Sequence, residues 1–288
     1  MNTKYKGILA VIISATIFGS MPLMAKIVYQ AGGNAISLTF YRFLLILPVL
    51  YLLIKRNDKE TLKIEKDEFK KIALVATLGY GATALLLYLS YNFIPSGMAT
   101  TIHFIYPVFV IIGCILFFKE KPSIVKIIAV VLCVLGVIMF YDGNGDINFT
   151  GIFLSFASSI TFAFYTVYID KSGLKKMNTM KLTFYLCIIA AAMMLIFSIV
   201  TKTFTIKMEP IGWLMAILLS LSVGLGVNLF QIGIKTVGPQ NTSILSTFEP
   251  ITSVIIGVFL LDESFGIKTF FGIGLILVAV IIVSVFEK

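Results

Sequence analysis

The ionisable side chains inside long apolar segments are the residues of this sequence that could do chemistry. Glu249, Arg42 and His103 each lie within a mostly apolar run, and His103 is the only histidine of the chain. A charged group at the centre of a membrane helix costs roughly 2.5–3.5 kcal/mol on insertion scales, so it usually faces a partner or a wet cavity. A carboxyl group in such a place is suited to proton coupling or to substrate contact.

Glu249 lies near the middle of its apolar segment. It follows the start of the segment by about ten residues, or about 15 Å of helical rise. Thr242, Ser246 and Ser253 fall on the same helical face at spacings of four, three and four residues. Polar stripes of this kind line cavities or helix contacts. We therefore expect a role in proton coupling or substrate contact, the alternative being a structural ion pair with Arg42.

Positive side chains lie toward the outer ends of the first, second and fourth segments. Arg42 is about six residues, or about 9 Å, from its segment's outer end, where it could instead snorkel to the membrane surface. His103 occupies the repeat position of Ser246, and its alternative role is a hydrogen bond between helices. Lys26 is expected to be an interfacial anchor. If two of these three groups face inward, they form a positive outer vestibule suited to a carboxylate or phosphate.

Polar and aromatic stripes in three further segments predict a central cavity. They comprise Ser220, Gly224, Asn228, Gln231 and Lys235; Ser158, Thr161, Tyr165 and Tyr168; and Tyr80, Tyr88 and Tyr91. Amides and phenols can hydrogen-bond a zwitterion while the rings pack against its apolar part. The candidate substrate-binding or coupling residues are Glu249, Arg42, His103, Ser246, Tyr106, Asn228, Gln231, Tyr88 and Tyr165.

Two prolines interrupt the polar segments. Pro107 and Pro250 each remove a backbone hydrogen bond, which frees in principle the carbonyls of His103 and Ser246. Freed carbonyls that line a cavity can bind substrate amines or ions. The alternative is a plain kink satisfied by a neighbouring side chain.

The composition requires a membrane. Of the 288 residues 59% are hydrophobic and 13% are charged, whereas soluble proteins carry roughly a quarter charged residues. Ten segments approach the roughly 20 apolar residues that span a bilayer: 7–28, 36–55, 71–92, 97–118, 123–141, 150–169, 180–201, 211–234, 239–261 and 266–286. The net charge of +9 lies in short loops, so nucleic-acid binding is not expected. Three isolated cysteines give no disulfide or metal pattern, and no cofactor is predicted.

The ten segments form two copies of one plan. Pro107 precedes Glu120 by thirteen residues, and Pro250 precedes Glu263 by the same thirteen. The predicted repeats are residues 1–144 and 145–288, each with five helices. Because five is odd, the second repeat enters the membrane from the opposite side. Inverted repeats are common in secondary transporters, which bind substrate near the midplane between the repeats.

Lysine and arginine positions predict the orientation. With the N-terminus inside, eighteen of these residues fall in inner segments and three, Lys202, Lys207 and Lys268, in outer loops. Positive residues gather on the cytoplasmic side. The bias therefore places both termini in the cytoplasm of a multi-pass protein of the cell membrane.

Short motifs in four segments carry a family resemblance. They are Phe18-Gly19, Tyr41-Arg42-Phe43, Tyr106-Pro107 with Lys119-Glu120, and Glu249-Pro250 with Asp262-Glu263. In their order they resemble the EamA-type transporters of the drug/metabolite transporter superfamily. The resemblance implies a carrier, often an exporter, of amino acids or other small metabolites. Relatives carry nucleotide sugars, sugar phosphates or organic cations.

The sequence thus favours a secondary transporter, not an enzyme, that moves an amino acid or related polar solute by alternating access. No P-loop is present, so coupling would come from a proton or substrate gradient, with Glu249 as the candidate carrier. Phosphorylated sugars, nucleotides and organic cations remain alternative substrates, and a passive channel is an alternative mechanism. The partners expected are a small-molecule substrate, membrane lipid and a coupling proton, and no oligomeric state is specified.

Overall fold

The structure, a computed structural model, describes residues 3–56, 61–94, 96–121, 123–139, 148–261 and 266–286. These residues are helical and contain no strand, which confirms the all-α prediction. The helices are α1 Thr3–Gly19, α2 Met21–Gln30, α3 Ala35–Leu44, α4 Leu47–Lys55, α5 Lys66–Leu74, α6 Ala82–Ser90, α7 Ser96–His103, α8 Tyr106–Phe118, α9 Ile124–Ile138, α10 Phe149–Lys171, α11 Thr179–Val200, α12 Pro210–Leu245, α13 Phe248–Leu261 and α14 Ile267–Phe286. A π-helical segment, Val75–Gly81, joins α5 to α6, and a 3₁₀ turn, Leu174–Lys176, follows α10.

Within the described residues, six helical stretches are long and apolar enough to cross a membrane. They are Thr3–Gln30, Ala35–Lys55, Lys66–Ser90, Phe149–Lys171, Thr179–Val200 and Pro210–Leu245. Of the other predicted spans, 97–118 coincides with α7 and α8, 123–141 with α9, 239–261 with the end of α12 and α13, and 266–286 with α14. Ten spans in two inverted repeats remain a prediction, and the repeat junction at 143–146 lies outside the described residues.

Several spans expected to be single helices are broken. Ser20 separates α1 from α2, and α4 and α8 also restart within a longer span, each with a proline in its first turn. Proline lacks an N–H and fits the first turn of a helix, where that N–H would have no intrahelical partner. The breaks therefore fall where proline costs least.

Gly238 breaks α12 between the predicted eighth and ninth spans. Its φ of 81° and ψ of 166° are not helical. A positive φ is open to glycine without steric cost, and the proline at 239 disfavours a helical conformation in the residue before it. Helix continues on both sides of this single residue.

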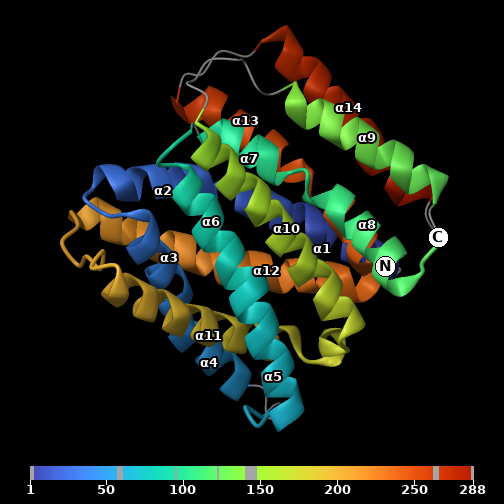
Figure 1. The fold of residues 1–288 in the computed structure, drawn as a ribbon. Helices are drawn as coiled ribbons and strands as arrows, with labels where there is room; N and C mark the ends of the chain where they lie inside the picture. The colour runs from blue at the N-terminus through green and yellow to red at the C-terminus, as the bar shows by residue number, and fades with distance from the viewer. Residues whose placement is uncertain are drawn as a thin grey trace.

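Close packing between α1 and α12 holds the centre of the fold (Figure 1). A Cβ added at Gly233 would lie 2.2 Å from Val11 Cγ2, and one at Gly226 would lie 2.5 Å from Phe18 Cε1. The hydroxyl of Ser14 donates to the Gly226 carbonyl across 2.7 Å. Small residues let these two backbones approach, as is common between membrane helices.

Backbone groups form one junction between the two halves of the sequence. Asn34 Nδ2 donates to the carbonyl of Thr203 across 2.8 Å. The hydroxyl of Tyr41 donates to the carbonyl of Thr205 across 2.9 Å. The ring of Trp213 packs on Tyr41 with centroids 4.8 Å apart. The segment between α11 and α12 is thereby fixed to the start of α3.

Candidate functional site

A cavity of about 90 Å³ lies where helices from both halves meet. Its walls come from α1, α2, α3, the π-helical segment, α6 and α7 in the first half and from α10, α12 and α13 in the second. The lining residues are Phe18, Met21, Pro22, Arg42, Tyr80, Thr83, Ala84, Leu87, Tyr88, Tyr91, His103, Phe162, Tyr165, Val227, Phe230 and Glu249.

Arg42 brings a positive charge to the cavity wall. Arg42 is only 8% exposed, and its Nε atom has no hydrogen-bond partner among the described residues. The guanidinium carbon lies 4.9 Å from the ring centroid of Phe43 and 5.1 Å from that of Tyr88. Aromatic faces attract a cation electrostatically. The charge is therefore held in the wall and does not snorkel to the surface.

Glu249 brings a carboxyl group to the same cavity from the first turn of α13. A helix N-terminus favours a negative group. Across the part of the chain that the structure describes, this side chain makes no hydrogen bond and no ion pair. The structural ion pair with Arg42, considered as an alternative, does not form.

Gly19 sets the position of Glu249. A Cβ at Gly19 would lie 2.6 Å from the Glu249 carbonyl oxygen. The hydroxyl of Ser253 donates to the Gly19 carbonyl across 2.8 Å. Because only glycine permits this approach, α1 and α13 meet closely enough to place Glu249 in the cavity wall.

Aromatic rings make most of the remaining wall. Tyr165 stacks on Tyr80 and on Phe162, with centroids 5.5 Å apart in each pair. Tyr80 comes from the π-helical segment, and such segments often occur at functional sites. Its buried hydroxyl has no hydrogen-bond partner among the described residues.

His103 lies against this aromatic wall. Its Nδ1 is 2.8 Å from Ser158 Oγ, and Ser158 donates its own hydrogen to the carbonyl of Ser155 across 2.6 Å. His103 Nδ1 must therefore be the donor, which leaves Nε2 as an acceptor in a neutral ring. His103 thus lines the cavity and also makes the interhelical hydrogen bond considered as its alternative.

The structure brings five of the nine candidate residues into the cavity lining and leaves four outside it. The five are Arg42, Tyr88, His103, Tyr165 and Glu249, and the four are Tyr106, Asn228, Gln231 and Ser246.

The four outlying residues make interhelical contacts. Tyr106 and Ser246 share a hydrogen bond. Gln231 Nε2 donates to the Tyr165 hydroxyl across 3.4 Å, and Asn228 Oδ1 accepts from Thr179 across 3.2 Å. Gln231 therefore lies directly behind a lining residue, Tyr165.

The carbonyl of Ser246, which Pro250 frees in principle, has a partner, as in the alternative of a satisfied kink. It accepts a hydrogen bond from the backbone nitrogen of Glu249 across 3.0 Å. The backbone makes a tighter turn just before α13, so the N–H of Glu249, three residues after Ser246, takes the place of the one that Pro250 lacks. This bond does not supply an open backbone site for a ligand.

Sequence reasoning did not assign Phe18, Phe162 and Phe230 to the cavity. All three lie in apolar runs, where the sequence does not distinguish a phenylalanine that lines a cavity from one that faces lipid or the protein core. The pairing of Phe18 with Gly226 is visible only after α1 and α12 are packed together. The adjacent Phe18-Gly19 pair was the available signal.

Comparisons with known proteins agree with this architecture. The model of the EamA-like transporter family matches residues 5–141 and again 149–285. An uncharacterized transporter of Synechocystis sp. is 24% identical, with 100% of this chain and 95% of that protein covered. The uncharacterized inner membrane transporter YicL of Salmonella typhimurium is 25% identical over 99% of this chain and 97% of its own length.

The fold is shared with a solved protein crystal structure. It superposes with a TM-score of 0.84 at 13% identity, over 98% of this chain and 99% of that one. At this identity the likeness shows the fold alone. The family model, in contrast, matches both halves and nearly the whole sequence. This chain therefore belongs to the EamA-like transporter family.

Proposed function

We propose that this protein is a secondary transporter that moves an amino acid or a related polar solute across the cytoplasmic membrane by alternating access, in the direction of export. One observation carries the proposal. Arg42 and Glu249, here called the cavity charges, line one cavity between the two halves and do not pair with each other.

A zwitterion fits the cavity charges. Removing a charged group from water costs free energy unless a partner replaces the water. A solute whose carboxylate meets Arg42 and whose ammonium group meets Glu249 satisfies both at once. The rings of Tyr80, Tyr88 and Tyr165 then pack against its apolar part.

Proton coupling through Glu249 completes the proposed mechanism. A carboxyl group that faces the cavity can bind either a proton or the substrate's ammonium group, and the exchange links the two. The helices are proposed as ten spans in repeats 1–144 and 145–288, the second inverted, with both termini in the cytoplasm. A cavity between inverted repeats is the common substrate position in such carriers.

Organic cations, phosphorylated sugars and nucleotides are the alternative substrates, and each would use only one of the cavity charges. A cation would need Glu249 alone, while a phosphate would need Arg42 and would meet a repelling carboxylate. A passive channel would use neither in a saturable way. Each alternative gives a distinct result in one experiment.

The experiment is counterflow uptake of a labelled amino-acid pool into proteoliposomes, with and without an inward proton gradient. We expect saturable uptake that loses its proton dependence in Glu249→Gln. Glu209→Gln is the matched control, because Glu209 is exposed and does not line the cavity. If the folded protein takes up no amino acid but exchanges a sugar phosphate or an organic cation, the proposed substrate is wrong. Non-saturable uptake would indicate a channel.

A further inference from the structure

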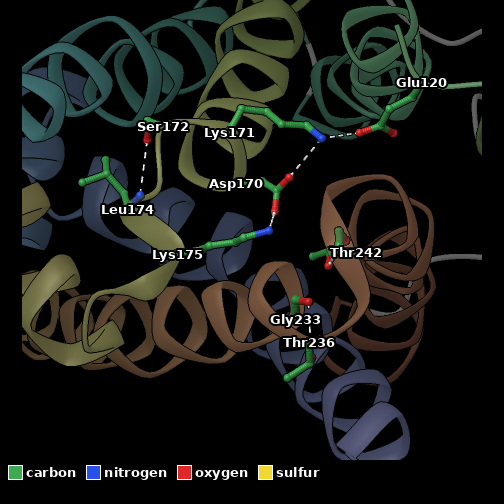
Figure 2. A network of polar contacts seen from close by, with 10 residues as sticks. Glu120, Asp170, Lys171, Ser172, Leu174, Lys175, Gly233, Thr236 and Thr242 are labelled. Carbon is green, nitrogen blue, oxygen red and sulfur yellow. Dashed lines mark hydrogen bonds and ion pairs between the residues drawn. The ribbon is translucent and has the colours of Figure 1, made fainter. Parts of the chain in front are cut away.

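A group of charged side chains joins the two halves of the protein beyond the cavity (Figure 2). Glu120, which follows α8 in the first half, forms an ion pair with Lys171 at the end of α10. The other oxygen of Glu120 accepts a hydrogen bond from Gln240 Nε2 across 2.5 Å. One first-half carboxylate therefore holds two helices of the second half.

Two further residues complete this group. Asp170 lies 3.3 Å from Lys171 Nζ and 2.5 Å from Lys175 Nζ. Two acidic and two basic side chains balance one another. Glu120, Asp170, Lys171, Lys175 and Gln240 are called the end network below.

The end network lies between the cavity and one end of the molecule. On α10 the cavity is lined by Phe162 and Tyr165, and Lys171 follows Tyr165 by six residues, or about 9 Å of helix. Lys71 also reaches this end, where it donates to the Ser172 carbonyl across 3.2 Å. By the positive-inside rule this lysine-rich end is the proposed cytoplasmic end.

The end network is suited to breaking and re-forming. Asp170 and Gln240 are buried. The side chains of Lys171, Glu120 and Lys175, in contrast, are 25%, 33% and 38% exposed, so water can replace the partner in the Glu120–Lys171 pair at low cost. Ion pairs with this access to water stabilise a fold only slightly. The backbone junction at Asn34 and Tyr41 instead uses carbonyl groups, which lose their partners if that junction separates.

We propose that the end network is the cytoplasmic gate of the transport cycle, and that separation of Glu120 from Lys171 and Gln240 opens the cavity to the cytoplasm. Glu120 is the network's only first-half member, so within the network its bonds to Lys171 and Gln240 are the ones that break when the halves separate at this end. This inference rests on the proposed transport function. Glu263, the repeat partner of Glu120, lies outside the described residues.

The test measures access to the cavity without using a substrate. Ala84, which lines the cavity, is replaced by cysteine after the three native cysteines are changed to alanine. A membrane-impermeant thiol reagent is added to inside-out or right-side-out vesicles. We expect Glu120→Gln to raise the labelling rate from the cytoplasmic side about fivefold, because this is the change in equilibrium that the loss of one weak ion pair produces. Labelling from the other side should not rise.

A charge-swap variant distinguishes loss of the ion pair from damage to the fold by a single substitution. Glu120→Lys combined with Lys171→Glu should return labelling toward the slow rate, whereas either change alone should not. Asp67→Asn is the matched control, because among the described residues Asp67 forms only an exposed ion pair with Lys70. Unchanged labelling in folded Glu120→Gln protein, or an equal rise from both sides, would overturn the gate.

The same result separates the gate from the proposed function. If no amino acid is transported but Glu120→Gln still opens the cytoplasmic side, the gate stands and the substrate proposal fails. If amino acids are transported and labelling does not respond, the transport function stands and the gate fails.

Discussion

The cavity charges and the end network show two uses of charged side chains in one membrane protein. The cavity charges lie deep between the helices and do not pair with each other. The end network gathers around the end of α10, with Glu120 and the two lysines partly in water, and each acid meets a base. Under the proposed function the two unpaired charges bind the substrate, whereas the paired charges join parts of the fold.

Among the variants that test this comparison, removal of the Arg42 guanidinium should have the largest effect on transport. We expect Arg42→Gln to weaken apparent substrate affinity by about 10- to 100-fold, because a hydrogen bond to a charged group contributes about 1.5–3 kcal/mol. The KM of counterflow uptake measures the change. Arg56→Gln removes an exposed arginine and serves as the control. If both variants keep normal affinity, Arg42 does not meet the substrate.

A substitution that displaces Glu249 but keeps its side chain tests whether transport depends on the position of that carboxyl group. In Gly19→Ala the new Cβ would lie 2.6 Å from the Glu249 carbonyl, so α1 and α13 must separate. We expect uptake to fall about tenfold, since a displacement near 1 Å can cost more than that in a positioned site. Gly274→Ala is the control, because its Cβ would meet nothing within 4 Å. Equal uptake by the two variants would show that this approach does not position Glu249.

The smallest effect is expected on stability at the end network. Glu120→Gln and Lys171→Gln should each lower the free energy of unfolding by about 1 kcal/mol or less, because the pair is partly in water. The double variant should lose less than the sum, since both changes remove one contact. Thermal unfolding in detergent measures all three proteins. Strict additivity would mean that the ion pair contributes nothing measurable.

Much of the fold was predictable because membrane helices follow from composition. A run of about 20 apolar residues admits few structures other than a helix. The breaks were harder to place, since Pro22 and Pro48 are tolerated in a first turn and do not show where the preceding helix ends. The π-helical segment that presents Tyr80 has no signature in an apolar run. Its position depends on packing, such as that of Gly79 against Tyr165.

The site divides in the same way. Arg42 and Glu249 could be identified because a charged side chain within a membrane helix is energetically costly and usually marks a functional site. Tyr106 and Ser246 have the same polar character, and yet they bond to each other outside the cavity lining. Helical spacing shows which residues share a face, but only the packing of neighbouring helices decides which part of that face meets the cavity.

The protein also carries its own optical reporter. Trp213 is the only tryptophan of the chain, and it packs on Tyr41 at the backbone junction, with centroids 4.8 Å apart. Its emission therefore comes from one defined place, and the nearby phenol passes excitation energy to it. A steady emission spectrum on addition of substrate would show that the surroundings of Trp213 at this junction do not change, without any attached dye.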